Sequence, residues 1–291
     1  NSLANSLKAK GYKTGVFHGF QRDFYNREEA YPNIGFDEYY SRRHFELDEV
    51  YNELLGDKTF LKQTANLLKD FKEPYYSFII TLTSHHPFNY LENYYGIYVG
   101  EYQGTVVGDY IKSIHYTDAA IGEFYETLKK DGTLENTVLA LHGDHVAFNY
   151  NEIDQEALNN FYDLDISDPL ERVKEHKVPF AIRLPDSQKG KTISDNAGMV
   201  DIFPTLANLL GIKNQYLMGR DLLNTEEEVI ILKSGSFIKD NKYFNAITQN
   251  QYDLETGKTE ILPEDDETLK KVRQTLEISR KIYETDFFAN N

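Results

Sequence analysis

The sequence contains no cysteine and no tryptophan, and its basic residues (31 Lys and Arg) are outnumbered by its acidic ones (47 Asp and Glu). Without cysteine, neither a disulfide framework nor thiolate chemistry is available. The formal net charge of −16 disfavours binding to nucleic acids and other polyanions. An anionic ligand would therefore need a metal ion or a local group of cationic side chains at its site.

Long apolar runs are also missing. No stretch approaches the roughly 18 consecutive apolar residues of a transmembrane helix, and the first residues do not have the pattern of a signal peptide. They instead predict a helix that leads into a strand, as in the middle of a longer protein. We expect any targeting or anchoring segment of the parent protein to precede them.

Strands and helices alternate along the first three quarters of the chain. This alternation is typical of an α/β fold in which a mostly parallel sheet is flanked by helices on both faces. Residues 18–36 are interpreted as a long turn of mixed composition. The predicted helices cover residues 2–10, 57–70, 107–130 and 198–212, and the predicted strands cover residues 13–17, 75–88, 138–141 and 178–185.

The pattern changes after about residue 225. Short β-rich runs joined by Gly and Asn predict antiparallel strands, and the charged segment 264–288 predicts a final long helix. We therefore expect a catalytic α/β domain over residues 1–224 and a small α+β subdomain over residues 225–291. In the helix at 198–212, Asp201 is the expected N-cap residue.

Histidines lie at the ends of three of the predicted strands, as His18, as His85 with His86, and as His142 with His145. Any one of these alone would be interpreted as a structural or surface histidine. The carboxyl ends of parallel strands, however, meet at the edge where ligands bind in open α/β sheets. Their coincidence on successive strands favours a functional site. The other three histidines, His44, His115 and His176, are interpreted as structural.

The stretch TVLALHGDHVAF (137–148) places Asp144 and His145 directly after an apolar strand that we expect to be covered on both faces. A carboxylate oxygen and an imidazole nitrogen together suit a divalent cation. Two ligands are too few for a complete metal site. Asp118 is a candidate third ligand, although its helical position favours hydrogen bonding within the fold.

Arg27 lies in the loop after the first strand, and a guanidinium group can hold a phosphate through two parallel hydrogen bonds. The alternative is a surface ion pair with Glu28 or Glu29. Tyrosine is abundant, with 22 residues, and many lie in the predicted loop FNYLENYYGIYVGEYQG (88–104).

An ordered series of segments resembles the lipoteichoic acid synthase family, a branch of the sulfatase and alkaline phosphatase superfamily. The resemblance spans roughly residues 5–223, and SFIKDNKYFN extends it into the C-terminal segment. The set in this order is far more specific than any single motif. The segments are LKAKGYKTGVFHG, FYNREE, GFDEYY, TLTSHHPF, YIKSIHYTDAAIGEF, TVLALHGDH, GMVDIFPTLANLLGI and MGRDLL.

The resemblance implies that Asp144 and His145 are ligands of one divalent metal ion. Because one ligand is a histidine, we expect Mn²⁺ in preference to Mg²⁺. The family's catalytic threonine and a glutamate metal ligand lie N-terminal to the helix that opens this chain, so we expect the first portion of the domain to be missing here.

The resemblance further implies that His18, Tyr25, Arg27 and His85 line the pocket for a glycerol phosphate group, with His85 also acting in catalysis. The family commonly has tryptophan at the position of Tyr25, and the tyrosine keeps an aromatic face while adding a hydroxyl group.

The implied activity is a metal-dependent phosphoglycerol transferase. It would move glycerophosphate from phosphatidylglycerol to a growing polymer of the lipoteichoic acid type or to its glycolipid primer. We expect this activity at the extracellular face of a bacterial membrane, with the protein anchored by upstream transmembrane helices. The isolated fragment would be inactive without the upstream threonine. A phosphodiesterase or sulfatase of the same superfamily, and a non-catalytic fragment that binds glycerophosphate, stay open as alternatives.

Overall fold

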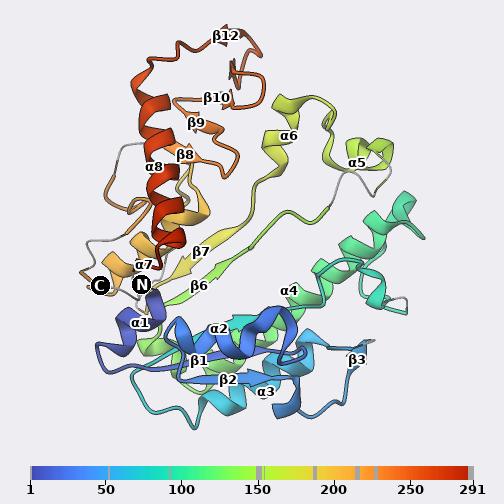
Figure 1. The fold of residues 1–291 in the computed structure, drawn as a ribbon. Helices are drawn as coiled ribbons and strands as arrows, with labels where there is room; N and C mark the ends of the chain where they lie inside the picture. Colours follow the sequence, from blue (N-terminus) through green and yellow to red (C-terminus); the bar gives the residue numbers. More distant parts are fainter. Residues whose placement is uncertain are drawn as a thin grey trace. The chain divides into compact units, whose positions relative to one another are not determined.

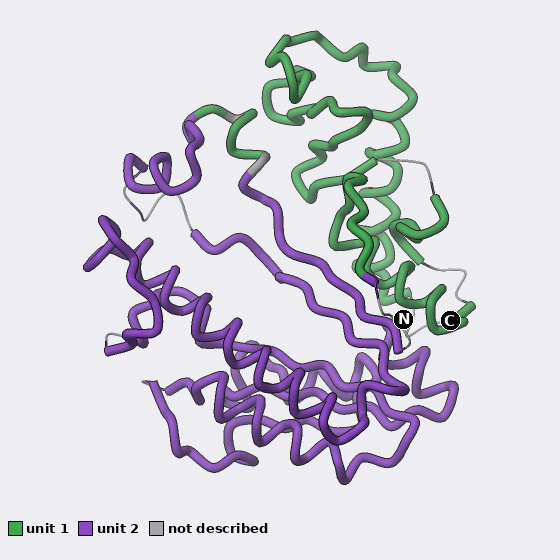
Figure 2. Tube along the Cα trace, turned by 180° about the vertical axis from the view of Figure 1, so that it is seen from behind, with its two compact units in different colours: residues 1, 168–174, 190–291 green, residues 2–167, 175–189 purple. Residues whose placement is uncertain are grey.

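The computed structural model describes residues 2–51, 53–91, 93–148, 153, 155–185, 189–213, 217–225 and 229–287. They form two compact units (Figure 2). The larger unit comprises residues 2–167 and 175–189, and the smaller unit comprises residues 168–174 and 190–291. Residues 190–224 belong to the same compact unit as the C-terminal segment, whereas the sequence pattern predicts a boundary near residue 225.

A parallel three-stranded sheet with the order β2–β1–β5 forms the centre of the larger unit (Figure 1). Val16 and Phe17 are neighbours on β1 and point to opposite faces, because side chains alternate along a strand. Both are fully buried. The expected α/β fold with a parallel sheet is therefore confirmed. The strands are β1 (Lys13–His18), β2 (Glu38–Ser41) and β5 (Tyr75–Ile80).

Two pairs of helices cover the two faces of this sheet. On one face Val16 packs in a cluster with Ala4 of α1 and Tyr31 of α2. On the other, Phe17 packs in a cluster with Phe60 of α3 and Phe124 of α4. The helices are α1 (Leu3–Lys8), α2 (Arg27–Asn33), α3 (Asp57–Leu68) and α4 (Val106–Lys130).

The limits of α4 follow from local sequence signals. The Thr105 side chain accepts a hydrogen bond from the Gly108 N–H at 3.1 Å and so caps the first turn. Gly132 adopts φ = 84°, a left-handed conformation that suits glycine just beyond a helix end. The helix predicted over 107–130 and its termination at Gly132 are confirmed.

Three expectations for the larger unit were wrong. The strand predicted over 75–88 ends at Ile80 and gives way to a turn in which the His85 N–H donates to the Leu82 carbonyl at 2.9 Å. Residues 18–36 are not only turn, since they contain the 3₁₀ helix η1 (Phe24–Asn26) and α2. The strand expected to be covered on both faces leaves Leu141 44% exposed.

Leu141 is exposed because of how its strand is paired. Strand β6 (Leu139–His142) pairs antiparallel with β7 (Phe180–Arg183) in a two-stranded ribbon, and among the described strands it pairs with no other. The larger unit also contains another antiparallel pair, further 3₁₀ helices and a short helix. They are β3 (Val50–Tyr51), β4 (Leu54–Leu55), η2 (Arg42–His44), η3 (Asn89–Leu91), η4 (Gly100–Tyr102), η5 (Thr133–Asn136) and α5 (Gln155–Tyr162).

The smaller unit contains a five-stranded antiparallel sheet with the order β12–β11–β10–β9–β8. Leu269 and Val272 of the final helix pack against Phe237 and Phe244 of this sheet. The predicted antiparallel strands and final helix are thus confirmed. The elements are η6 (Met199–Asp201), α7 (Ile202–Leu209), β8 (Val229–Ile231), β9 (Phe237–Lys239), β10 (Lys242–Asn245), β11 (Asn250–Asp253), β12 (Thr259–Ile261) and α8 (Glu267–Glu284); α6 (Pro169–Glu175) lies at the junction of the two units.

Asp201 precedes α7, but its side chain does not cap that helix. It is buried and accepts hydrogen bonds from the backbone N–H groups of Gly198 at 2.8 Å and Arg220 at 2.9 Å. The expected N-cap is therefore a link between two loops. None of the helices in the described parts of the chain is both long and apolar enough to cross a membrane.

Candidate functional site

His18 ends β1 and is 1% exposed. Its Nδ1 lies 3.4 Å from the Ile80 carbonyl oxygen, which only accepts, so Nδ1 carries the proton. Its Nε2 is buried and has no hydrogen-bond partner among the described residues. Burial, helped by the nearby positive charge of Arg27 and by His85, lowers the pKa of His18 to about 3. The imidazole is therefore neutral, with its Nε2 lone pair available to a ligand.

Arg27 begins α2, and its Nη1 is also buried without a hydrogen-bond partner among the residues described. The guanidinium carbon lies 5.6 Å from the centre of the Phe24 ring. Among the described residues Arg27 forms neither of the alternative ion pairs, with Glu28 or with Glu29, and Glu28 instead pairs with Arg22. The residue as a whole is only half-buried, but its buried Nη1 donor lacks an acceptor, and an anionic ligand would offset the cost of that unmet hydrogen bond.

Tyr25 lies between Phe24 and Arg27 on an unusual backbone. Tyr25 (φ = 53°) and Asn26 (φ = 55°) are both left-handed, which is uncommon for residues other than glycine. The Tyr25 side chain is 81% exposed, and its ring centre lies 4.4 Å from that of Phe24. Such strained conformations cluster at ligand-binding sites, where the surrounding structure maintains them.

His85 and His145 lie close together although 60 residues separate them in the sequence. Their ring centres are 5.9 Å apart and their planes are perpendicular. In each ring Nδ1 lies 2.7 Å from a backbone carbonyl oxygen, that of His86 for His85 and that of Val146 for His145. Since a carbonyl only accepts, each Nδ1 acts as a donor, which leaves the Nε2 atom of each ring for another partner.

Asp144 and His145 offer part of a metal site. The Asp144 Oδ1 and the His145 Nε2 lie 3.7 Å apart, and both side chains are more than half exposed. A carboxylate and an imidazole with a free Nε2 fit a divalent cation. Within the described ranges, no three His, Cys, Asp or Glu side chains are arranged to hold a metal ion. Asp118, the candidate third ligand, lies exposed on α4.

The structure thus places the predicted residues in one unit and connects most of them. Arg27 and His85 both lie near enough to His18 to lower its pKa electrostatically, and the His85 ring adjoins that of His145. Tyr25 is connected to Arg27 through the Phe24 ring, which both side chains contact. Of the histidines interpreted as structural, His44 is hydrogen-bonded to the Ser41 backbone and His115 to the Tyr94 hydroxyl.

Asp57 is a residue of this region that sequence reasoning missed. It starts α3, is fully buried and accepts hydrogen bonds from the backbone N–H groups of Leu82 at 2.8 Å and Thr83 at 2.9 Å. Burial raises the pKa of its carboxyl group, and the hydrogen bonds oppose that rise. Asp57 therefore holds the backbone just before His85. Its place before an apolar helical pattern was a signal for a helix start, not for this contact.

Comparison with known proteins identifies the family. The sulfatase family model matches residues 1–212. Lipoteichoic acid synthase 2 of Bacillus subtilis is 33% identical over 294 residues, which cover 98% of this chain and 44% of that protein. The chain spans less than half the length of such curated relatives.

Solved structures agree on the fold. The lipoteichoic acid synthase LtaP from Listeria monocytogenes superimposes with a TM-score of 0.81 at 27% identity, over 99% of this chain and 72% of that one. The periplasmic domain of EptC from Escherichia coli, solved in complex with zinc, shares the fold at a TM-score of 0.53 and 13% identity, over 79% and 68% of the two chains. The chain belongs to the sulfatase family and is homologous to the lipoteichoic acid synthases over most of its length.

Proposed function

We propose that this chain is part of a metal-dependent phosphoglycerol transferase, which moves glycerophosphate from phosphatidylglycerol to a growing lipoteichoic-acid-type polymer or to its glycolipid primer. The observation that carries the proposal is the buried Arg27 Nη1, which has no hydrogen-bond partner among the described residues and lies near the neutral His18. This local positive charge lies in a chain whose formal net charge is −16. The homology to lipoteichoic acid synthases supports the same substrate class.

In this proposal each residue contacts a different part of the glycerol phosphate group. Arg27 donates to the phosphate oxygens, and charge-assisted bonds of this kind are among the strongest in proteins. The His18 Nε2, which carries no proton, accepts from a glycerol hydroxyl group. The exposed Tyr25 ring covers the glycerol carbons. The His85 ring adjoins that of His145, and we propose that His85 contacts the phosphoryl oxygens.

Asp144 and His145 would hold a divalent cation, for which we propose Mn²⁺. When bound, such a cation neutralises charge on the phosphoryl oxygens and lowers the pKa of an attacking hydroxyl group. The remaining ligand and the nucleophilic threonine are proposed to precede residue 1 in the parent protein. We also propose that this protein acts at the extracellular face of the bacterial membrane, anchored by helices outside this chain.

Binding of sn-glycerol-1-phosphate tests the substrate assignment. Arg27→Ala should raise its dissociation constant by about tenfold or more, because hydrogen bonds to charged groups contribute about 1.5–3 kcal/mol. Arg43→Ala is the matched control, since Arg43 is exposed on η2. Calorimetric or NMR titration of the three proteins gives the result. Equal affinity of the wild type and Arg27→Ala would remove Arg27 from the site.

Turnover tests the place of the nucleophile. The 291-residue chain, incubated with Mn²⁺ and fluorescent phosphatidylglycerol, should release no diacylglycerol. Release of diacylglycerol would place the nucleophile within residues 1–291 and contradict the proposed mechanism.

A further inference from the structure

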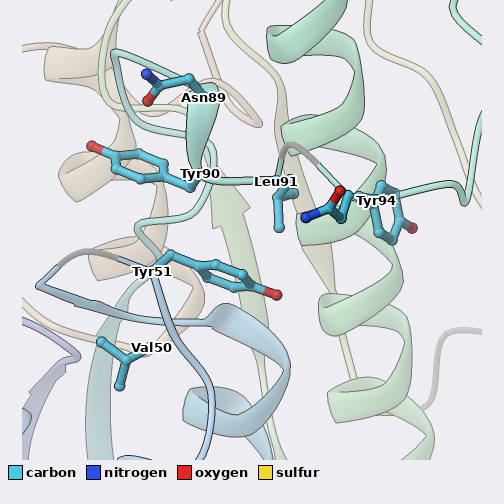
Figure 3. Close-up of a pocket in the computed structure, with 7 residues that line it drawn as sticks. Val50, Tyr51, Asn89, Tyr90, Leu91 and Tyr94 are labelled. Atoms are coloured by element: carbon cyan, nitrogen blue, oxygen red, sulfur yellow. The ribbon is translucent and has the colours of Figure 1, made fainter.

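The larger unit contains a pocket outside the site described above. Its volume is about 530 Å³, within the range of small-molecule sites. Strand β3 forms one side, and the segment around η3 forms the other. Figure 3 shows Asn89, Tyr90 and Leu91 along one segment above Val50 and Tyr51. The lining residues are Val50, Tyr51, Asn89, Tyr90, Leu91, Asn93 and Tyr94.

The lining is aromatic and polar but carries no formal charge. It consists of three tyrosines, two asparagines and two aliphatic residues, none of which is ionised at neutral pH. Glu49, just before β3, accepts a hydrogen bond from the Tyr51 hydroxyl at 2.7 Å. Burial and this hydrogen bond raise the pKa of Tyr51 to about 12. A phosphate would therefore meet no cation on the lining and a negative charge behind it.

The aromatic walls are held in place by residues behind the pocket. Tyr94 bonds to the His115 Nδ1 at 2.8 Å and meets the Tyr116 ring edge-on at 5.7 Å. Tyr51 meets the same ring edge-on at 6.1 Å. A Cβ atom at Gly56 would lie 2.9 Å from the Tyr116 hydroxyl oxygen and 3.0 Å from the Tyr51 ring, so glycine makes this close packing possible. These contacts fix the positions of the Tyr51 and Tyr94 rings.

The pocket is also linked to the loop that carries His85. The Tyr90 hydroxyl donates to the His86 carbonyl oxygen at 3.2 Å, and the His85 Nδ1 shares that same carbonyl. A ligand against Tyr90 would therefore lie within a few residues of the proposed transfer site along the chain.

We propose that this pocket binds an uncharged sugar ring. Tyrosine faces pack on the C–H surface of a pyranose, and the Asn89 and Asn93 amides both donate to and accept from its hydroxyl groups. Because the lining carries no charge, the pocket should not bind glycerol phosphate, for which we propose the site at Arg27. The identification of this sugar as the headgroup of a glycolipid acceptor rests on the proposed transferase function, whereas sugar binding itself does not.

An NMR titration of the ¹⁵N-labelled chain tests the proposal. The probes are methyl β-D-glucopyranoside, a β-linked glucose disaccharide and sn-glycerol-1-phosphate. Both sugars should shift the side-chain amide signals of Asn89 and Asn93 saturably, with dissociation constants on the order of millimolar for such small ligands. The absence of saturable shifts with either sugar, or shifts of these amides by glycerol phosphate alone, would overturn the proposal.

Three variants make the test specific. Asn89→Ala and Tyr90→Ala should each raise the dissociation constant of the disaccharide by about five- to tenfold. Tyr90→Phe keeps the ring and should change it by less than about twofold, which shows that the Tyr90→Ala effect comes from the ring face. Tyr95→Ala is the matched control, because Tyr95 lies in the same segment, is 87% exposed and does not line the pocket. An equal loss in Tyr95→Ala would contradict the assignment.

The sugar titrations test the pocket, and the glycerol phosphate titration tests the proposed function, so each proposal can be contradicted without the other. Loss of sugar binding with Arg27-dependent glycerol phosphate binding intact would remove the pocket proposal alone. Sugar binding without Arg27-dependent glycerol phosphate binding would leave the pocket and remove the proposed function.

Discussion

The Thr117 hydroxyl donates to the Asp57 carboxylate at 2.9 Å, across 60 residues of sequence. This bond joins the start of α3 to the middle of α4. The same carboxylate accepts from the Leu82 and Thr83 N–H groups, so it connects both helices to the turn that leads to His85. One buried side chain thus sets the relative positions of three segments of the larger unit.

Asp57→Ala should lower the free energy of unfolding by about 2–5 kcal/mol, because it leaves buried donors without an acceptor. Asp70→Ala, at an exposed position just after α3, is the matched control and should change it by less than about 0.5 kcal/mol. Urea unfolding followed by circular dichroism measures both. A change in Asp57→Ala no larger than in the control would show that the network does not stabilise the fold.

The pH dependence of stability should report His18. Its folded pKa of about 3 lies below the ordinary value of 6.5, so below pH 6.5 the unfolded chain binds a proton that the folded chain does not. The stability contributed by the neutral imidazole is therefore present above pH 6.5 and is lost as the pH falls. Between pH 7 and pH 5 this loss amounts to about 2 kcal/mol.

His18→Gln removes the titrating group and should remove this part of the pH dependence. Urea unfolding of wild type and variant at pH 7, 6 and 5 gives the comparison. The stability of the wild type relative to the variant should fall by about 2 kcal/mol over this range. Parallel profiles for the two proteins would show that His18 titrates normally in the folded state.

The sequence predicted those parts of the fold that local signals determine. Gly132 ended α4 where expected, and the strand predicted over 13–17 matches β1, in which the adjacent apolar residues Val16 and Phe17 are both buried. The helix α2 was missed because it follows two left-handed residues, Tyr25 and Asn26, and no apolar periodicity marks residues 18–36. The antiparallel pairing of β6 with β7 joins segments about 40 residues apart, and no local pattern encodes such a pairing.

The candidate site was likewise predictable from the sequence only in part. The histidines at the strand ends were visible in the sequence, and the structure brings the rings of His85 and His145 together. The burial of the Arg27 Nη1 and the His18 Nε2 results from tertiary packing and could not be read from their neighbours in the chain. The tyrosine-rich loop at 88–104 was the signal for the pocket, but tyrosine content alone did not show which rings would meet.

Metal binding should depend on both predicted ligands. In the complete protein, Asp144→Ala and His145→Ala should each abolish Mn²⁺ binding and activity, since each removes one of a small number of ligands. His142→Ala tests the third member of the same motif, whose Nδ1 lies 3.0 Å from the Gly143 carbonyl oxygen, and it should retain the metal. Metal content of the purified variants decides the question. Wild-type content in Asp144→Ala or His145→Ala would show that this motif only ends a strand.

A glycine substitution at the left-handed Tyr25 should affect stability and ligand binding differently. Glycine adopts φ = 53° without the steric cost that tyrosine bears, but it loses more conformational entropy on folding. The two effects oppose each other, so Tyr25→Gly should change the free energy of unfolding by less than about 1 kcal/mol.

Binding should respond differently, because the exposed ring is proposed to cover the glycerol carbons. Tyr25→Gly should raise the dissociation constant of sn-glycerol-1-phosphate by about threefold or more, while Tyr25→Trp, which keeps an aromatic face, should leave it within about twofold. Urea unfolding and calorimetric titration of the two variants measure the two quantities independently. Unchanged affinity in Tyr25→Gly would show that the Tyr25 ring does not contact the ligand.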